Sequence, residues 1–125
     1  MVTTDSTNRT LDGYEKAPVL IVTTEGIPGY RVVEVKGEVF GLVVRSRGLT
    51  GNIMAGLRSL GGGEITEYTE LLEQARHHAI DRLVENTRAM GANAVTMMRF
   101  DSSEIGQTMS EIVAYGTGVV VEPIE

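Results

Sequence analysis

The sequence contains no cysteine and no tryptophan, and its 125 residues include only two Phe and four Tyr. Without cysteine, disulfide bonds, zinc–thiolate sites and a cysteine nucleophile are all excluded. Few aromatic side chains argue against an aromatic ligand box, whereas 15 glycines favour tight turns and close backbone packing. The lack of cysteine also fits a reducing compartment, and we expect a cytoplasmic protein.

Excess positive charge and long apolar runs are also missing. Eleven Lys and Arg stand against 17 Asp and Glu, and the resulting net charge of −6 argues against a general nucleic-acid binder. The longest apolar runs are far shorter than the roughly 20 residues of a membrane-spanning helix. The first residues show no signal-peptide pattern. We therefore expect no nucleic-acid partner and no membrane partner.

The length of the chain predicts one domain that can bury a core of its own. Residues 1–16 are polar and rich in Thr, Asp and Asn, so they cannot bury enough apolar surface to order themselves. This segment is interpreted either as a flexible tail or as an arm that lies on a neighbouring surface. The predicted domain organisation is an N-terminal arm at residues 1–16 and a single domain at residues 17–125.

A long helix is predicted at residues 67–90, which contain no Gly or Pro. Gly91 is expected to end it in the left-handed conformation. The face is narrow and includes two alanines, so another element can approach it closely. Seven residues lie within about 40° of one line on this helix: Tyr68, Leu72, Ala75, Ala79, Leu83, Asn86 and Met90.

Four segments have the β-branched and apolar composition of strands, namely residues 18–24, 30–47, 94–100 and 108–121. Gly37 and Gly41 interrupt the second segment. It is interpreted as one long bent strand with glycine bulges, or as a hairpin that turns at Lys36 and Gly37. The polar residues 101–107 are expected to form the turn between the last two strands.

These elements predict an α+β fold with a mainly antiparallel sheet, one long helix and one short helix at residues 53–60. In the last strand Ala114, Gly116 and Gly118 share one face, which is expected to lie close to another backbone, such as the alanine side of the long helix. One long helix cannot cover both faces of a sheet. The remaining Val-rich face predicts self-association.

The only histidines, His77 and His78, are adjacent and point about 100° apart on a helix, so they cannot bind one metal together. Glu73, His77 and Asp81 do share a helix face at a four-residue spacing. They are a candidate site for a divalent metal ion with nitrogen and oxygen ligands, or else a solvated helix surface.

Three methionines, Met97, Met98 and Met109, offer thioethers to a soft metal ion, or else fill the core. Met97 and Met98 are neighbours on a predicted strand and should face opposite sides, which separates them as ligands. The cofactor is therefore left open as unknown, with a divalent or soft metal ion as the candidate.

Residues 31–58 form the one basic stretch in an acidic chain. If Arg45, Arg47 and Arg58 converge, they form a site for a phosphate or another anion. The alternative is ion pairing with the acidic remainder of the chain. No P-loop, nucleophile elbow, zinc-protease motif or dinucleotide fingerprint is present, and no nucleophile–base set is evident, so we expect no enzyme.

The motif Gly-Ala-Asn-Ala-Val at residues 91–95 follows the long helix, and Tyr-Gly-Thr-Gly-Val occupies residues 115–119 of the last strand. With the segments at residues 52–62 and 68–76, this pattern resembles the YbjQ-like family over residues 18–121. The resemblance implies a dodecin-subunit-like fold that assembles into a pentameric ring with a barrel-like sheet. The family has no established activity and carries a heavy-metal-binding label, but no family ligand motif matches a particular residue here.

Three functions are therefore expected in order. The first is a cytoplasmic homo-oligomer, a pentamer by the resemblance, that acts as a binding or structural protein without catalysis. The second is a heavy-metal or small-ligand-binding protein with its site at a subunit interface or on the ring axis. The third is an enzyme or nucleotide binder that uses Arg45, Arg47 and Arg58 at subunit boundaries.

Overall fold

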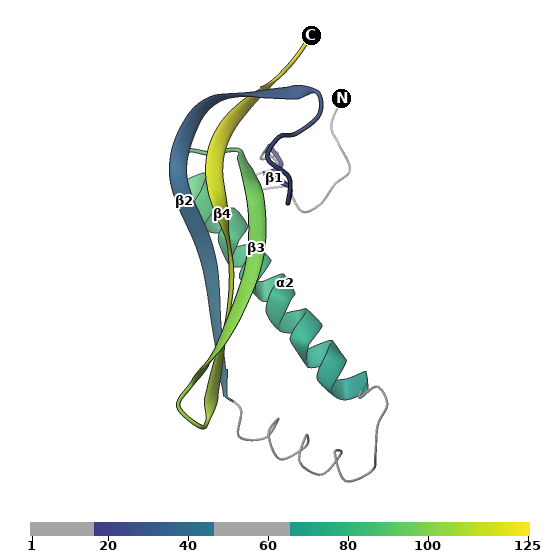
Figure 1. The fold of residues 1–125 in the computed structure, drawn as a ribbon, viewed down its shortest axis with the longest axis vertical. Coiled ribbons are helices and arrows are strands. Elements are labelled where there is room, and N and C mark those ends of the chain that lie inside the picture. The colour runs from purple at the N-terminus through teal and green to yellow at the C-terminus, as the bar shows by residue number, and fades with distance from the viewer. Residues whose placement is uncertain (1–16, 47–65) are drawn as a thin grey trace, which may run out of the picture.

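The computed structural model describes residues 17–46 and 66–125, which form one four-stranded sheet with one long helix against it (Figure 1). The elements are β1 (Leu20–Ile21), β2 (Tyr30–Ser46), α2 (Thr66–Ala89), β3 (Ala94–Ile105) and β4 (Met109–Pro123). The strand order is β1-β3-β4-β2; β1 runs parallel to β3, and the other pairs are antiparallel. The predicted α+β class is confirmed. The short helix expected at residues 53–60 and the arm at residues 1–16 lie outside the described residues.

The predicted long helix is confirmed, one residue earlier at each end. Its C-terminus is closed by two backbone hydrogen bonds, from Gly91 N to Arg88 O at 3.0 Å and from Ala92 N to Thr87 O at 3.1 Å. Gly91 has a φ of 84°, the left-handed conformation that such an ending requires. The part of the chain that the structure describes has no helix long and apolar enough to cross a membrane.

The second predicted segment is one strand and not a hairpin. β2 pairs with β4 along its whole length, from Tyr30 opposite Pro123 to Ser46 opposite Met109. Its register shifts twice, and Gly37 lies at the second shift with a φ of 119°. The prediction of a glycine bulge is therefore confirmed at Gly37. It is wrong at Gly41, which lies in a regular part of the ladder.

The turn predicted at residues 101–107 is wrong for most of its length. β3 continues to Ile105, and the chain turns at Gly106, which has a φ of 63°. Asp101 and Ser103 pair with Val113 and Glu111 of β4. Pairing with a strong neighbouring strand thus overrides the polar composition of this segment, and its side chains stay exposed to water.

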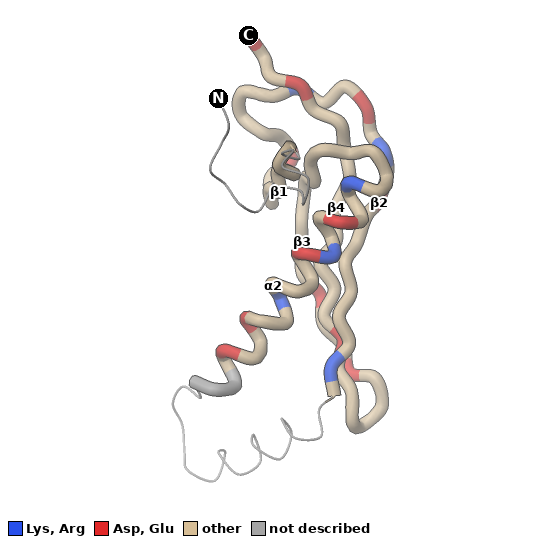
Figure 2. The backbone as a smooth tube through the Cα atoms, turned by 180° about the vertical axis from the view of Figure 1, so that it is seen from behind, with Lys and Arg blue, Asp and Glu red and all other residues tan. Residues whose placement is uncertain are grey.

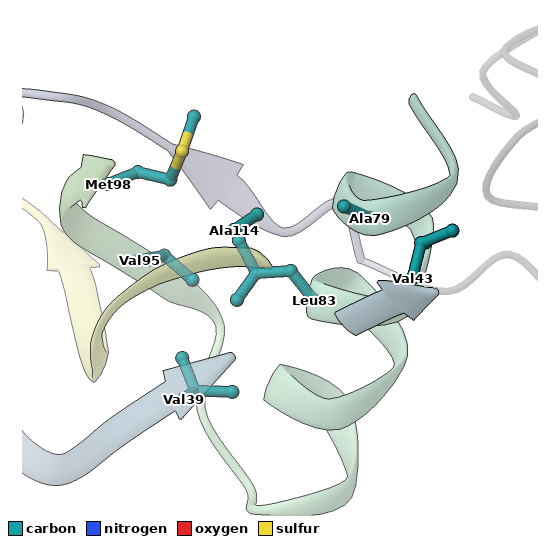
Figure 3. Close-up of a cluster of buried hydrophobic side chains, with 7 residues drawn as sticks. All are labelled: Val39, Val43, Ala79, Leu83, Val95, Met98 and Ala114. Carbon is teal, nitrogen blue, oxygen red and sulfur yellow. The ribbon is translucent and has the colours of Figure 1, made fainter. Parts of the chain in front are cut away.

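The core lies between α2 and the sheet. The cluster shown in Figure 3 consists of Val39, Val43, Ala79, Leu83, Val95, Met98 and Ala114. On the helix, the buried line runs through Ala75, Ala79, Leu83 and Thr87. The predicted face is therefore displaced, because Leu72 is 43% exposed and Asn86 is exposed. Figure 1 shows the reason for Leu72: the N-terminal half of α2 diverges from the sheet.

A smaller cluster covers the sheet face opposite α2, near the start of β3 and the end of β4. Ala94, Val119 and Val121 are buried there against Leu20 and Ile27 from the segment that precedes β2. This part of the opposite face is therefore already covered within one chain.

Asn93 joins α2 to this part of the sheet. Its side-chain Nδ2 donates to Val121 O at 3.0 Å, and its Oδ1 accepts from Val121 N at 2.8 Å. The side-chain amide thus makes the two hydrogen bonds to β4 that the backbone of one additional β3 residue would make. This explains the asparagine in the Gly-Ala-Asn-Ala-Val motif, because it satisfies two groups of β4 beyond the end of the β3 ladder.

The expected close packing of the last strand is confirmed, with two kinds of neighbour. Ala114 is fully buried against Ala79 and Leu83 of the helix side. At Gly116, by contrast, a Cβ would come within 2.6 Å of Val95 Cγ1 and 2.8 Å of Thr96 O, which belong to β3. The neighbour of Gly116 is thus the adjacent strand, at the point where β3 changes register.

Candidate functional site

Arg45, the first of the three predicted anion-binding arginines, contacts the long helix. Its Nη2 lies 2.8 Å from Nδ1 of His78. A guanidinium can only donate, so His78 Nδ1 is the acceptor. Among residues 17–46 and 66–125, Arg45 Nε is buried without a hydrogen-bond partner. Arg47 and Arg58 lie outside the described residues, so the anion site that combines all three arginines stays a prediction.

The other cations of the basic stretch pair with carboxylates. Arg31 Nη2 lies 3.3 Å from Glu122, and Lys36 Nζ lies 3.1 Å from Glu34. Such exposed pairs each contribute at most about 1 kcal/mol to stability. Figure 2 shows Lys and Arg interspersed with Asp and Glu along the described chain. In that part of the chain, the arrangement fits the alternative of ion pairing better than a concentrated basic surface.

The predicted metal ligands Glu73, His77 and Asp81 are all exposed along α2. Within residues 17–46 and 66–125, no three His, Asp or Glu side chains are grouped so that they could hold a metal ion. One subunit therefore provides no fitting site in this part of the chain, and the role of these three residues as ligands stays a prediction.

The methionines are separated, as predicted. Met98 belongs to the core at 9% exposure, whereas Met97 is 39% exposed and Met109 lies at the exposed start of β4. Met97 has a φ of 56°, in the left-handed region that costs a side-chain-bearing residue about 1–2 kcal/mol. It lies at the register shift of β3, between Thr96 and Arg99.

The surface with the clearest potential for binding lies on the sheet face opposite α2, along the second half of β2 and the first half of β4. Gly41 lies against the helix, so its neighbours Phe40 and Leu42 point to the other side. Residues opposite one another in antiparallel strands share a face, which places Tyr115 beside Phe40 and Val113 beside Leu42.

This surface, called the open face below, exposes large apolar side chains. Phe40 is 53% exposed and Tyr115 is 40% exposed. The full set consists of Phe40, Val44, Ile105, Met109 and Tyr115, with the half-buried Leu42 and Val113 between them. Sequence reasoning predicted an uncovered Val-rich face and placed Tyr115 on the side of the last strand opposite its small residues, but it did not assign Phe40 to a face. Their alternation with Gly41 and Ala114, the small residues against the helix, is the signal that identifies them.

Comparison with known sequences places this fold in a family. The sequence model of the YbjQ family, described as "Putative heavy-metal-binding", matches residues 19–122. A UPF0145 protein of Bradyrhizobium sp. (strain ORS 278) is 66% identical over 105 residues, which cover 84% of this chain and 95% of that protein. A UPF0145 protein of Sulfurisphaera tokodaii is 57% identical over 108 residues, covering 86% of this chain and 95% of that protein.

A solved structure supports the same architecture. A protein of unknown function from Pediococcus pentosaceus, assigned to the DUF74 family, superimposes with a TM-score of 0.55 over 83% of this chain and 98% of that chain. The two sequences are 14% identical, so this likeness concerns the fold alone. Together with the match over residues 19–122, the UPF0145 relatives show that the chain belongs to the YbjQ family.

Proposed function

We propose that this protein is a cytoplasmic homo-oligomer that acts as a binding or structural protein without catalysing a reaction. We further propose that it assembles through the open face. The observation that supports this proposal is the exposure of Phe40, Tyr115 and their apolar neighbours on one face of the sheet, where Arg99, Asp101 and Glu111 also lie. Large apolar side chains gathered on one exposed face among polar residues are characteristic of a protein–protein contact, because leaving them in water is unfavourable.

The ring of five subunits that the family resemblance implies would bury the open face of each subunit against a neighbour. A closed ring repeats one heterologous contact, so every subunit receives a neighbour and no apolar surface is left at an end. The sheet also offers strand edges for such a contact: β1 is only two residues long, and β3 extends beyond it to Ile105. Assembly would thus complete a sheet that one subunit leaves partly uncovered.

Replacing Phe40 by Lys together with Tyr115 by Glu is expected to convert the assembled protein into monomers. The two positions face each other across β2 and β4, and Arg99 faces Tyr115 from β3. The new row would alternate in charge, which preserves the sheet of a monomer. In an interface between subunits the same charges would lose their hydration, which is strongly unfavourable. Sedimentation equilibrium at micromolar concentration measures the change.

Leu72→Glu is the matched control, because Leu72 is also exposed and apolar but lies on α2. The control is expected to retain the wild-type mass. A monomeric wild-type protein would refute the proposed self-assembly. An oligomeric Phe40→Lys, Tyr115→Glu variant would show that assembly uses another surface.

The family description favours one second candidate, a heavy-metal or small-ligand-binding protein. The described part of one chain does not group three suitable ligands, so a site built from that part would combine side chains from several subunits. A ring supplies several copies of one Asp, Glu or His around its axis. Calorimetric titration with Zn²⁺, Cu²⁺, Ni²⁺ and Cd²⁺ is then expected to give binding heat with the assembled protein and none with the monomeric variant. Equal heats from both would contradict a shared site.

A further inference from the structure

The middle of β2 is bonded to side chains of α2. Arg82 Nη1 donates to Leu42 O at 2.7 Å, and Asn86 Nδ2 donates to Phe40 O at 2.7 Å. Both helix residues are otherwise exposed to solvent. The core does not require these two polar side chains, because the buried line of α2 runs through neighbouring positions.

The two carbonyl groups lie on the outer edge of the sheet. β2 is the last strand in the order β1-β3-β4-β2. The backbone groups of Val121 bond with Asn93 on the β3 side of β4. Backbone groups alternate along a strand, so the groups of Ala114 point toward β2 and bond with Gly41 opposite. Phe40 O and Leu42 O, on either side of Gly41, must therefore point away from β4.

The helix reproduces the spacing of a pairing strand. Arg82 and Asn86 are four residues apart, a rise of about 6 Å along a helix. Carbonyl groups two residues apart on a strand are separated by about 6.6 Å. One turn earlier, His78 accepts from Arg45 of the same strand. Three successive turns of α2 thus contact β2 from Phe40 to Arg45.

The first half of β2, on the same edge, pairs irregularly with β4. The register of β2 shifts between Val32 and Glu34 and again between Val35 and Gly37. Bulges disrupt the regular row of backbone groups that an added strand would need, and they twist the edge away from a partner. The 17-residue edge strand is thus bonded to helix side chains at Phe40 O and Leu42 O, and its register is shifted at two positions nearer its start.

We propose that Arg82 and Asn86 exclude the edge of β2 from strand pairing with another chain, which leaves the open face and the edge of β3 beyond β1 as the surfaces for self-assembly. The proposal rests on the proposed function in that it assumes self-assembly. A long edge strand is a template for the addition of further strands, which would produce open-ended aggregates instead of a closed assembly. Two helix donors that occupy consecutive outward carbonyl groups interrupt this template in the middle of β2.

The test is the double variant Arg82→Ala, Asn86→Ala, which frees both carbonyl groups. It is expected to form species much heavier than the wild-type assembly in sedimentation velocity, with thioflavin T fluorescence raised several-fold. The matched control is Arg76→Ala, Gln74→Ala, which removes the same two chemical groups from α2; Arg76 stacks over Phe100 and Gln74 is exposed. The control is expected to keep the wild-type size distribution.

A conservative variant separates edge exclusion from loss of stability. Arg82→Lys with Asn86→Gln retains a donor at each position and is expected to suppress the heavy species. A wild-type size distribution for Arg82→Ala, Asn86→Ala would overturn the proposal, as would equal aggregation of the control. If the wild-type protein is itself monomeric, the proposed self-assembly fails, whereas heavy species that form only in this double variant still support edge exclusion.

Discussion

Replacing Gly41 by Val is expected to prevent folding, and replacing it by Ala to lower the free energy of unfolding by about 3 kcal/mol or more. A Cβ at this position would collide with Ala79 O and Leu83 N, and would lie 2.9 Å from Arg82 C. All three atoms belong to the helix backbone, so no side chain can rotate to make room. Relief would require α2 to move away from the core that it covers. Urea denaturation followed by circular dichroism measures the loss.

Gly26→Ala is the matched control for this prediction. Its backbone does not have a positive φ, and a Cβ there would meet no atom within 4 Å. We expect its free energy of unfolding to lie within about 0.5 kcal/mol of the wild-type value. A Gly41→Ala protein as stable as the Gly26→Ala control would show that α2 can shift on the sheet at little cost.

The elements whose signals are local could be predicted from the sequence. The long helix and its end at Gly91 follow from composition and from one glycine in the left-handed conformation. Gly37 and Gly41 show where such reasoning ends. Both interrupt the same strand, yet one bends the backbone and the other admits the helix. Only the register of α2 on β2, a contact between segments far apart in the chain, distinguishes the two roles.

The same limit applies to the buried face of the helix. The pattern predicted Leu72 and Asn86 as inward residues, but the buried line includes Thr87 instead. Thr87 is tolerated in the core because its hydroxyl donates to Leu83 O at 2.7 Å. Asn86 lies beside the core, where its amide reaches β2. The predicted helical spacing was correct. Which helix positions are buried depends on how α2 packs on the sheet, which the sequence does not show.

The sequence predicted that an uncovered sheet face exists, but it did not predict which residues of the different strands lie side by side on that face. That one helix leaves a sheet face uncovered follows from counting elements, and this predicted self-association. Which residues form that face depends on the cross-strand register, which places Phe40 beside Tyr115. The contacts of Arg82 and Asn86 with β2 have no sequence signal beyond a four-residue spacing. The arginine cluster depends on Arg47 and Arg58, which lie outside the described residues.

Leu83 is the centre of the contact between α2 and the sheet, and Leu83→Ala is expected to lower the free energy of unfolding by about 3–5 kcal/mol, the upper part of the usual range. Its side chain is fully buried. Ala79 and Ala114 belong to the same cluster, and side chains so short cannot extend into the space that the leucine would vacate. Urea denaturation of both proteins at one protein concentration measures the difference, because assembly makes stability depend on concentration.

Two variants test whether a cavity is the cause. Leu83→Met retains most of the volume and is expected to lose less than about 1.5 kcal/mol. Leu72→Ala removes the same atoms from a leucine that is 43% exposed on the same helix, and is expected to lose less than about 1 kcal/mol. Equal losses for Leu83→Ala and Leu72→Ala would mean that the close approach at Gly41, and not the burial of Leu83, holds α2 on the sheet. A large difference, together with the tolerance of methionine, would assign the stability of this layer to the burial of Leu83 among the valine, alanine and methionine side chains of the sheet.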